Sequence, residues 1–364
     1  MTPDGTRPVS ASYAPDLRVP AVDADATGAA SFRGSLPEAL LYLGPRGSFT
    51  HQAAVRSASA LSDLYGHEPR PTPVDDVPRI MDVVESGEAW GVIAWENNVE
   101  GYVVPNLDAL IDARNVTGIA RVAVDVAFDA FVLRDSVDVP LRQAVAHPHG
   151  LAQCRDFIAR RGLVPVPAAS NAAACRDLQP GQVALGPAVC GPLYSRRTLE
   201  SGVQDFAGAR TDFLVLAPRD DARVLLERQR ASGIMDFESV VVFIPLSTGP
   251  GVLADLLDVL RDAGLNMTSF ISRPIKGHDG TYSFIATVDA APWQPGFHEV
   301  LGRLAAHGDW MKTLAVYARR ERPNPPVDAW MLPAGGVGPA VPLSRDGDGA
   351  GESAESSCER ELLW

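Results

Sequence analysis

The chain has 364 residues, 46% of them hydrophobic and 21% charged, which is ordinary for a globular protein of two or three domains. Its formal net charge of −13 argues against a general binder of nucleic acids or anionic membranes, because both select basic surfaces. The apolar runs are far too short for a membrane span and no export signal opens the chain, so we expect a cytoplasmic protein. The cysteines lack CxxC or zinc-ligand spacing and are expected to be small buried side chains: Cys154, Cys175, Cys190 and Cys358.

Both ends of the chain lack the apolar periodicity of a packed core. Residues 1–36 are rich in Ala, Pro, Asp and Ser, and residues 319–364 are rich in Pro and Gly. The sequence therefore predicts a flexible leader and a flexible tail around a folded body.

Strand patterns alternate with helical patterns after the leader. An apolar strand over 39–43 precedes a helical pattern, a strand over 90–97 runs into polar residues, and a last strand covers 212–218. This alternation predicts an α/β fold with a largely parallel sheet, in which ligands bind beyond the carboxyl ends of the strands. Four polar clusters stand at such ends: 44–50, 96–100, 147–149 and 170–171.

A second unit follows a charged segment, 219–236, which we expect to be a mobile linker. Residues 237–318 have the order strand, helix, strand, strand, helix, strand, which is the ferredoxin-like pattern. Apolar residues in the first of these helices recur at core spacing: Leu253, Leu256, Leu257 and Leu260. The predicted fold class is therefore α/β, with a ferredoxin-like unit at the C-terminal side.

Taken alone, the polar residues also have ordinary structural explanations. A Thr before an apolar run, such as Thr211, commonly caps or edges a strand, and Glu96 with Asn97 fits a strand-to-helix turn. His147 and His149 flank a proline, but no further ligand stands at metal-site spacing, so we expect turn histidines and no metal. The residues by themselves leave structural and functional explanations open.

Several motifs in one order resemble the prephenate dehydratase family over about residues 40–318. They are YLGPRGSFTHQAA from 42, ENNVEG from 96, NLDAL from 106, HPHGLAQC from 147, ASNAAA from 169, YSRRTLESGVQDF from 194 and TDF from 211. The segment GPGVLADLLDVLRDAGLNMTSFISRP, from 249, resembles an ACT domain. Separate motifs in a shared order are specific, whereas a single motif is weak evidence.

The resemblance implies a two-lobed catalytic domain over 38–218, similar to a periplasmic binding protein. Lobe 1 would hold about 38–118 and 205–218, lobe 2 would hold about 119–204, and the ACT domain would hold 237–318. The resemblance also implies a homodimer or homotetramer, no cofactor, and phenylalanine as an effector at the ACT domain.

The activity that the resemblance implies is conversion of prephenate to phenylpyruvate, water and CO₂ in L-phenylalanine biosynthesis. Joint loss of the ring carboxylate and ring hydroxyl makes an aromatic ring, so the enzyme must orient a dianion and protonate a poor leaving group. By resemblance Thr211 is the proton donor, and Glu96 serves substrate binding by holding the loop or tuning a partner. The other substrate-binding residues that the resemblance implies are Ser48, Asn97, Asn98, Gln153, Ser170, Asn171, Arg210 and Phe213.

The catalytic motifs depart from the family pattern near Thr211. The family's Thr-Arg-Phe reads Thr211-Asp212-Phe213, so an Arg that could pair a substrate carboxylate is replaced by an acid that would repel it. Residues 93–95 and Asn98 also differ around the ENNVEG motif, which predicts a reshaped cleft.

The ACT motif departs as well. The family's Glu-Ser-Arg-Pro begins with Ile271 here, and the missing carboxylate weakens capture of an amino-acid ammonium. Phenylalanine feedback is therefore in doubt. The regulatory residues concerned are Gly251, Val252, Leu253, Asn266, Ile271, Ser272, Arg273 and Pro274.

These departures leave alternatives to the leading prediction of a dehydratase. One is a prephenate decarboxylase of specialised metabolism, which releases CO₂ but keeps the ring hydroxyl. Another is an arogenate dehydratase, because Asp212 in the cleft would favour the ammonium of arogenate. The third is a non-catalytic sensor of small acids, against which the retained Thr211 argues.

Overall fold

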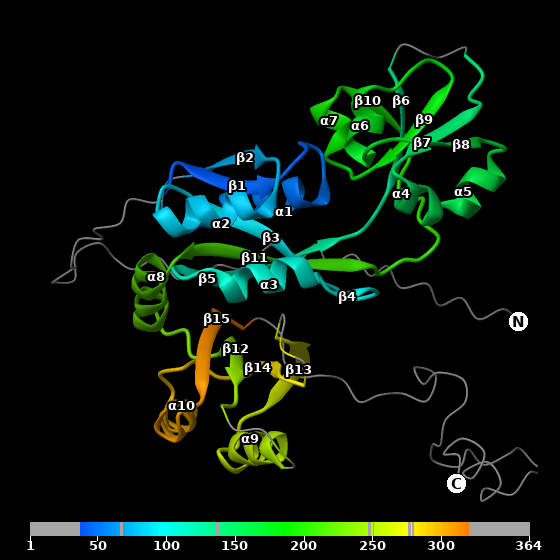
Figure 1. Ribbon diagram of the computed structural model, residues 1–364. Coiled ribbons are helices and arrows are strands. Elements are labelled where there is room, and N and C mark those ends of the chain that lie inside the picture. Colours follow the sequence, from blue (N-terminus) through cyan, green and yellow to red (C-terminus); the bar gives the residue numbers. More distant parts are fainter. Residues whose placement is uncertain are drawn as a thin grey trace, which may run out of the picture. The chain divides into compact units, whose positions relative to one another are not determined.

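The computed structural model describes residues 37–65, 68–134, 139–246, 249, 251–275, 278 and 280–319. The expected leader, 1–36, and all of the expected tail after Arg319 lie outside the described residues. The described strands form two sheets, one of ten strands and one of five (Figure 1).

The N-terminal part of the ten-stranded sheet contains Thr211. Its strands are β1 (Ala39–Leu43), β2 (Arg70–Val74), β3 (Trp90–Asn97), β4 (Gly101–Tyr102), β5 (Val116–Asp125) and β11 (Arg210–Pro218). β1 runs parallel to β2 and β3, but β11 is antiparallel to both β3 and β5. The chain leaves this sheet through β5 and returns to it through β11, so these two neighbours run in opposite directions. The sheet is mixed, and the prediction of a largely parallel sheet is wrong here.

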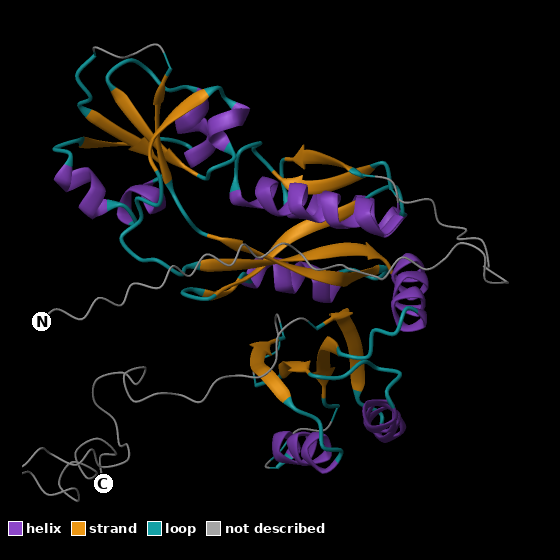
Figure 2. Cartoon of the chain, turned by 180° about the vertical axis from the view of Figure 1, so that it is seen from behind, coloured by secondary structure: helices purple, strands orange, loops and turns teal. Residues whose placement is uncertain are grey.

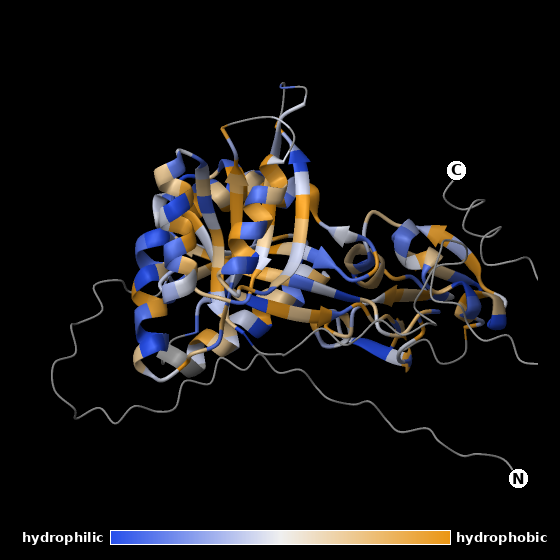
Figure 3. Cartoon of the chain, turned by 90° about the horizontal axis from the view of Figure 1, so that it is seen from below, coloured by the Kyte–Doolittle hydropathy of each residue, from blue (hydrophilic) through white to orange (hydrophobic). Residues whose placement is uncertain are grey.

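Helices cover both faces of this part of the sheet. They are α1 (Phe49–Tyr65), α2 (Val77–Ser86), α3 (Val104–Asp112) and α8 (Arg219–Ala231). Successive residues of β11 divide between two cores, because side chains alternate along a strand. Leu214 and Leu216 pack with residues of α2 and α3, whereas Phe213 and Val215 pack with residues of α1 and α8. Figure 3 shows apolar strand residues between the helical layers.

The five-stranded sheet is inserted between β5 and β11 and has its own cores. Its strands are β6 (Asp129–Leu133), β7 (Gln143–Ala146), β8 (Val164–Pro167), β9 (Gln182–Gly186) and β10 (Arg196–Glu200). Its helices are α4 (Pro148–Ala152), α5 (Arg155–Arg160), α6 (Asn171–Arg176) and α7 (Cys190–Leu193). Two buried clusters, around Phe157 and around Phe131, fill it. Two sheets with separate cores fit the two-lobed fold of a periplasmic binding protein.

The C-terminal unit follows with the order strand, helix, strand, strand, helix, strand. Its elements are β12 (Phe237–Ile244), α9 (Val252–Asp262), β13 (Met267–Pro274), β14 (Tyr282–Val288), α10 (Pro295–His307) and β15 (Trp310–Ala318). Both helices pack on one face of this antiparallel sheet (Figure 2). Val240 and Leu314 belong to the other face and share a core with Leu214 of β11. Ala315 of β15 also pairs with Gly118 of β5, so the unit continues the sheet that contains Thr211.

The segment expected to be a mobile linker, 219–236, contains helix α8. Its apolar residues recur at helical spacing, and Leu225 and Leu226 are buried in two different cores. Acidic residues in its first turn and Arg228 and Arg230 near its end also suit the helix dipole. The expectation of a mobile segment is wrong for 219–231, because the charged positions form only the outer side of a packed helix. No helix in the described ranges is long and apolar enough to cross a membrane.

Candidate active site

Thr211 and Asn97 form one rung of the β11–β3 ladder. The neighbouring rung pairs Asp212 with Glu96, and a bulge follows it, because Phe213 pairs with Ala94. Side chains of adjacent rungs face opposite sides of a sheet, so the two rungs serve different surroundings.

The orientation of the Asn97 amide is determined by its hydrogen bonds. Its Oδ1 accepts from the backbone N–H groups of Val99 (2.9 Å) and Glu100 (3.1 Å). Its Nδ2 must then point the other way, and it donates to Thr211 Oγ1 at 2.9 Å. The hydroxyl of Thr211 thereby accepts one hydrogen bond and keeps its own proton for a further partner. That is the arrangement that a proton donor needs.

Asn98 braces the entrance of β11 with both ends of its amide. Its Nδ2 donates to Gly208 O at 2.8 Å, and its Oδ1 accepts from the Arg210 N–H at 2.7 Å. The backbone N–H of Asn98 also donates to Arg210 O at 3.0 Å. The structure thus uses Asn98, a predicted substrate-binding residue, to hold the turn before Thr211.

Asp212 does not share the Thr211 side of the sheet. Its side chain is 7% exposed, and its Oδ2 accepts from Arg121 Nε at 3.0 Å and Nη2 at 2.5 Å. Arg210 Nε lies 3.5 Å from Asp212 Oδ1, so this predicted substrate ligand also faces away from Thr211. The expectation that Asp212 repels a substrate carboxylate is wrong, because its charge is paired on the opposite face.

Glu96 belongs to the same group of charged side chains. Arg121 Nη2 donates to Glu96 Oε2 at 3.1 Å, and Nη1 donates to Glu238 Oε1 at 3.4 Å. Burial raises the pKa of Glu96, Arg121 lowers it in part, and the carboxylates of Asp212 and Glu238 raise it further. Glu96 is therefore placed behind the Thr211–Asn97 rung and not beside it. Glu96 was expected to hold the loop or tune a partner, and the partner that it contacts here is Arg121.

Phe213 is buried in the core beneath the sheet. Its side chain is 1% exposed and packs in the core between the sheet and helix α1. The predicted contact with substrate is replaced by a packing role that fixes the strand next to Thr211.

Ser48 lies at the start of helix α1 and caps it. Its Oγ accepts from the His51 N–H at 3.1 Å, and His51 Nδ1 accepts from the Gly47 N–H at 3.0 Å. Burial and the charge of Arg46 lower the pKa of His51, which agrees with an unprotonated Nδ1. The loop is thus held by a neutral histidine, and Ser48 has a structural partner within it.

The predicted residues of the second lobe gather around helices α4 and α6. Ser170 Oγ accepts from the Ala173 N–H at 2.9 Å and caps α6, and Asn171 Oδ1 accepts from the His147 N–H at 2.9 Å. Gln153 ends α4, where its carbonyl accepts from the Asp205 N–H at 2.7 Å. The structure therefore brings Ser170 and Asn171 together on one lobe, and Thr211 and Asn97 together on the other.

Direct contacts between the lobes occur at the loop that precedes α1. The Tyr194 hydroxyl donates to Arg46 O at 2.6 Å, and the Cys190 thiol donates to Gly47 O at 3.1 Å. A Cβ at Gly47 would lie 3.0 Å from the Tyr194 ring, and its φ of 89° also favours glycine. Beside this contact is a cavity of about 730 Å³, and its charged and aromatic lining residues are Arg46, Asp75, Arg176 and Tyr194. Thr211 does not line it.

Three cysteines are buried, as predicted: Cys154, Cys175 and Cys190. Burial and nearby Asp205 raise the pKa of Cys154 to about 12, so its thiol stays protonated at neutral pH. Cys358 lies outside the described residues. Among the described residues no group of three or more His, Cys, Asp or Glu side chains could hold a metal ion.

The predicted regulatory residues of the C-terminal unit face in several directions. Arg273 Nη2 donates to Asp108 of α3 at 3.1 and 3.3 Å, and Ile271 packs against the core shared with β11. Asn266 donates to Asp289 at 2.6 Å, and Gly251, with φ of 96°, precedes helix α9. Arg273 thus binds the lobe of its own chain that contains Thr211, which we call the catalytic lobe.

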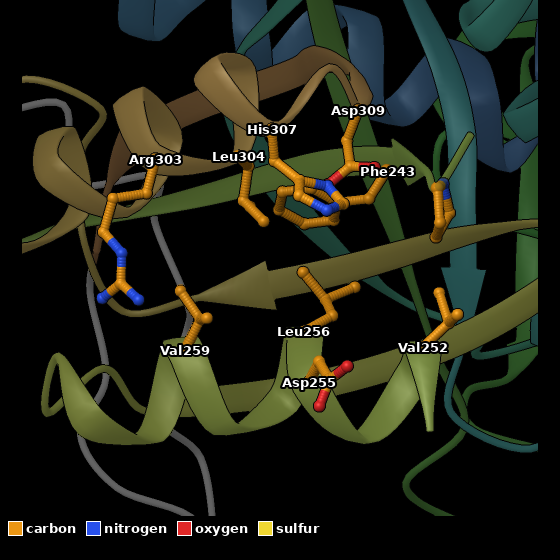
Figure 4. A pocket seen from close by; sticks show the side chains of 10 residues that line it. Phe243, Val252, Asp255, Leu256, Val259, Arg303, Leu304, His307 and Asp309 are labelled. Carbon is orange, nitrogen blue, oxygen red and sulfur yellow. The ribbon is translucent and has the colours of Figure 1, made fainter. Parts of the chain in front are cut away.

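Helices α9 and α10 of the C-terminal unit enclose a separate cavity of about 310 Å³ (Figure 4). Phe243, Leu256 and Leu304 form its apolar wall, and Val252 is the predicted regulatory residue that lines it. His307 Nδ1 lies 3.1 Å from Asp309 Oδ2 at its edge.

Sequence reasoning missed Arg121, Glu238 and Tyr317. Each stands in an apolar strand. The charges of Arg121 and Glu238 in such strands are themselves a signal, because charges in apolar surroundings need partners. Burial opposes the charge of Arg121, but Tyr317, Asp212 and Glu238 raise its pKa overall. The partners could not be named from the sequence, since Asp212 is 91 residues away from Arg121 and Glu238 is 117 away.

Comparison with known proteins finds relatives that match both lobes of the N-terminal region. The family model described as prephenate dehydratase matches residues 40–221. A prephenate dehydratase of Amycolatopsis methanolica is 32% identical over 78% of this chain and 89% of its own length. The prephenate dehydratase of Arthrobacter aurescens, solved in complex with L-Phe, has a TM-score of 0.63 at 23% identity, covering 80% of this chain and 94% of its own.

A solved protein described as a novel type of quorum quenching acylase has a TM-score of 0.64 at 22% identity, covering 77% of this chain and 98% of its own. At such identities the two solved structures show the fold alone. The matches to the family model and to the Amycolatopsis methanolica protein cover the motifs around Asn97 and Thr211. The chain therefore belongs to the prephenate dehydratase family.

Proposed function

We propose that this protein is a prephenate dehydratase, a carbon–oxygen lyase that converts prephenate to phenylpyruvate, water and CO₂ in phenylalanine biosynthesis. The observation that carries the proposal is the hydrogen bond from Asn97 Nδ2 to Thr211 Oγ1, at 2.9 Å. It leaves the Thr211 proton available to a leaving group. The identity of the substrate, prephenate, is inferred from the family to which the chain belongs.

The reaction can be followed bond by bond. The bond from the ring to its carboxylate breaks, and its electron pair enters the ring as CO₂ leaves. The ring carbon–oxygen bond breaks in turn, and the departing oxygen takes the Thr211 proton to leave as water. The Asn97 N–H then stabilises the negative charge left on Thr211 Oγ1 until solvent returns a proton.

The placement of Asp212 bears on the alternatives. The argument for an arogenate dehydratase rested on an acid in the cleft, and that for a decarboxylase rested in part on an altered residue beside the proton donor. Asp212 instead pairs with Arg121 on the other face of the sheet. The Thr211 face therefore keeps the residues that the dehydratase reaction needs, and this supports the dehydratase over both alternatives.

Incubation of the purified full-length chain with prephenate tests the proposal. Absorbance and mass spectrometry would show phenylpyruvate from a dehydratase. A dihydro-hydroxyphenylpyruvate would instead identify a decarboxylase. Product formation no faster than spontaneous decay of prephenate would contradict an activity on prephenate altogether, and parallel incubation with arogenate would then test that substrate.

We also propose that residues 237–318 form an ACT domain with a structural role. The order of its elements supports the assignment, and Arg273 supports the role, because its guanidinium binds Asp108 of the catalytic lobe. Added phenylalanine is expected to leave turnover unchanged; strong inhibition would contradict this role. A homodimer or homotetramer is proposed as well, and light scattering of the full-length chain measures its mass.

A further inference from the structure

A partly buried ion cluster lies directly behind the Thr211–Asn97 rung. The Arg121 cluster, as we call it, has five members: Glu96, Arg121, Asp212, Glu238 and Tyr317. Glu96 directly precedes Asn97, and Asp212 directly follows Thr211; we call the Thr211–Asn97 pair the reactive rung. One guanidinium therefore binds both strands that contain the rung.

The other end of the cluster belongs to the C-terminal unit. Glu238 is on β12 and is 7% exposed, and its Oε1 accepts from Arg121 Nη1 at 3.4 Å. The Tyr317 hydroxyl of β15 donates to the same Oε1 at 2.5 Å. Both residues are at the junction with the catalytic lobe and contact no ligand in the proposed mechanism. Asp212, Glu238 and Tyr317 are buried, whereas the side chains of Arg121 and Glu96 are 28% and 29% exposed. Removal of one buried partner leaves the Arg121 charge less compensated and forces the others to move.

The bulge makes the reactive rung sensitive to such a movement. The shift in pairing falls between Asp212 and Phe213, one rung beyond the Thr211–Asn97 rung. Bulges redirect nearby side chains, and here Asp212 is tied to β5 by two hydrogen bonds from Arg121. The direction of the Thr211 side chain therefore depends on the adjacent Asp212–Glu96 rung, which Arg121 binds.

We propose that Arg121, Asp212 and Glu238 are positioning residues through which the C-terminal unit holds Thr211 and Asn97 in their reactive orientation. This inference rests on the proposed function. Asp212, at the position where the family has Arg, then attaches the strand of the proton donor to the C-terminal unit. The unit is part of the catalytic geometry and not a separable module.

Two uncharged variants of the full-length chain test the inference: Asp212→Asn and Glu238→Gln. Each is expected to lower kcat for prephenate about 10- to 100-fold while KM changes less than about twofold, because a small misplacement affects the transition state most. Since both act through Arg121, the double variant is expected to lose little more than the worse single variant. Unchanged kcat, a change in KM alone, or losses that multiply in the double variant would overturn the inference.

The matched control is Glu200→Gln. Glu200 also accepts from two arginines, Arg160 and Arg161 at 2.7 Å each, but it lies on the other sheet. It is expected to keep the wild-type kcat. Tyr317→Phe removes one hydrogen bond from the cluster and keeps the ring, so a partial loss of kcat is expected even where the charge variants fold poorly.

A measurement without turnover separates this inference from the proposed function. In protein labelled with ¹³C-methyl threonine, the Thr211 methyl signal, assigned through Thr211→Ser, is expected to move in Glu238→Gln and to stay in Glu200→Gln. An unmoved signal would overturn the coupling. Absence of wild-type turnover would contradict the proposed function, and the methyl signal would still decide whether the C-terminal unit sets Thr211.

Discussion

Thr211 and Asp212 are neighbours on β11, yet their side chains face opposite sides of the sheet. The Thr211 hydroxyl accepts from Asn97, whereas the Asp212 carboxylate is buried against Arg121. The acid that follows Thr211 therefore belongs to the side toward the C-terminal unit and leaves the Thr211 side as it is. Separate substitutions can address the two sides.

Replacement of Thr211 by Val should remove the proton donor and keep a β-branched side chain suited to the strand. We expect kcat to fall about 10²- to 10⁴-fold, the usual contribution of a positioned acid. Steady-state rates of phenylpyruvate formation measure this, with Thr211→Ser as the variant that keeps a hydroxyl and most of the activity. Equal rates in the Val variant and the wild type would rule out Thr211 as the donor.

Replacement of Asn97 by Asp should invert the hydrogen bond to Thr211. A carboxylate oxygen accepts where the Nδ2 group donated, so the Thr211 proton turns toward residue 97 and the stabilising N–H is lost. We expect kcat to fall about 10²- to 10³-fold. The melting temperature should change little, because the N–H groups of Val99 and Glu100 keep an acceptor.

The control for this variant is Glu100→Gln, which changes an exposed side chain of the same turn. It should retain the wild-type rate. A similar loss of rate in both variants would show that the turn, and not the amide, matters.

Stability should fall with acidification through His51. Burial and Arg46 hold the pKa of His51 below its ordinary value of 6.5, so the unfolded chain takes up a proton that the folded chain resists. Stability from this group is present above that ordinary value and is lost as pH falls through the lowered pKa. Protonation also ends the bond from Gly47 N–H to Nδ1.

The variant His51→Asn keeps an acceptor near the Nδ1 position and does not titrate. Thermal melts at about pH 7.5 and about pH 5.5 should show a smaller drop for this variant than for the wild type. Equal drops in the two proteins would show that His51 is not the titrating group.

Helix α8 should behave as part of the core. Leu225 is 4% exposed, and Leu225→Ala is expected to lower the free energy of unfolding by about 2–5 kcal/mol. Val224 on the same helix is 36% exposed, and Val224→Ala should change that free energy by about 0.5 kcal/mol or less. Urea unfolding measures both free-energy changes, provided that the slope of the free energy against urea concentration is the same in variant and wild type. Two small and equal effects would support the mobile linker that the charged sequence predicted.

Much of the local structure was predictable because helix and strand periods are properties of neighbouring residues. The strand before the ENNVEG motif was expected over 90–97 and is observed as Trp90–Asn97. The helix after Gly251 was also expected, and it spans Val252–Asp262. The resemblance to the family, carried by motifs at separate points of the chain, is confirmed by the family match.

The sequence by itself therefore determined many of the helices and strands, though not helix α8, and that a threonine stands where the last strand of the catalytic region enters the sheet. Tertiary structure alone decided which side chains share a face. Arg121, Asp212 and Glu238 are far apart in the chain, and only the antiparallel return of β11 and the packing of the C-terminal unit bring them together. A charged side chain in an apolar strand needs partners, and the tertiary fold determines which residues those partners are.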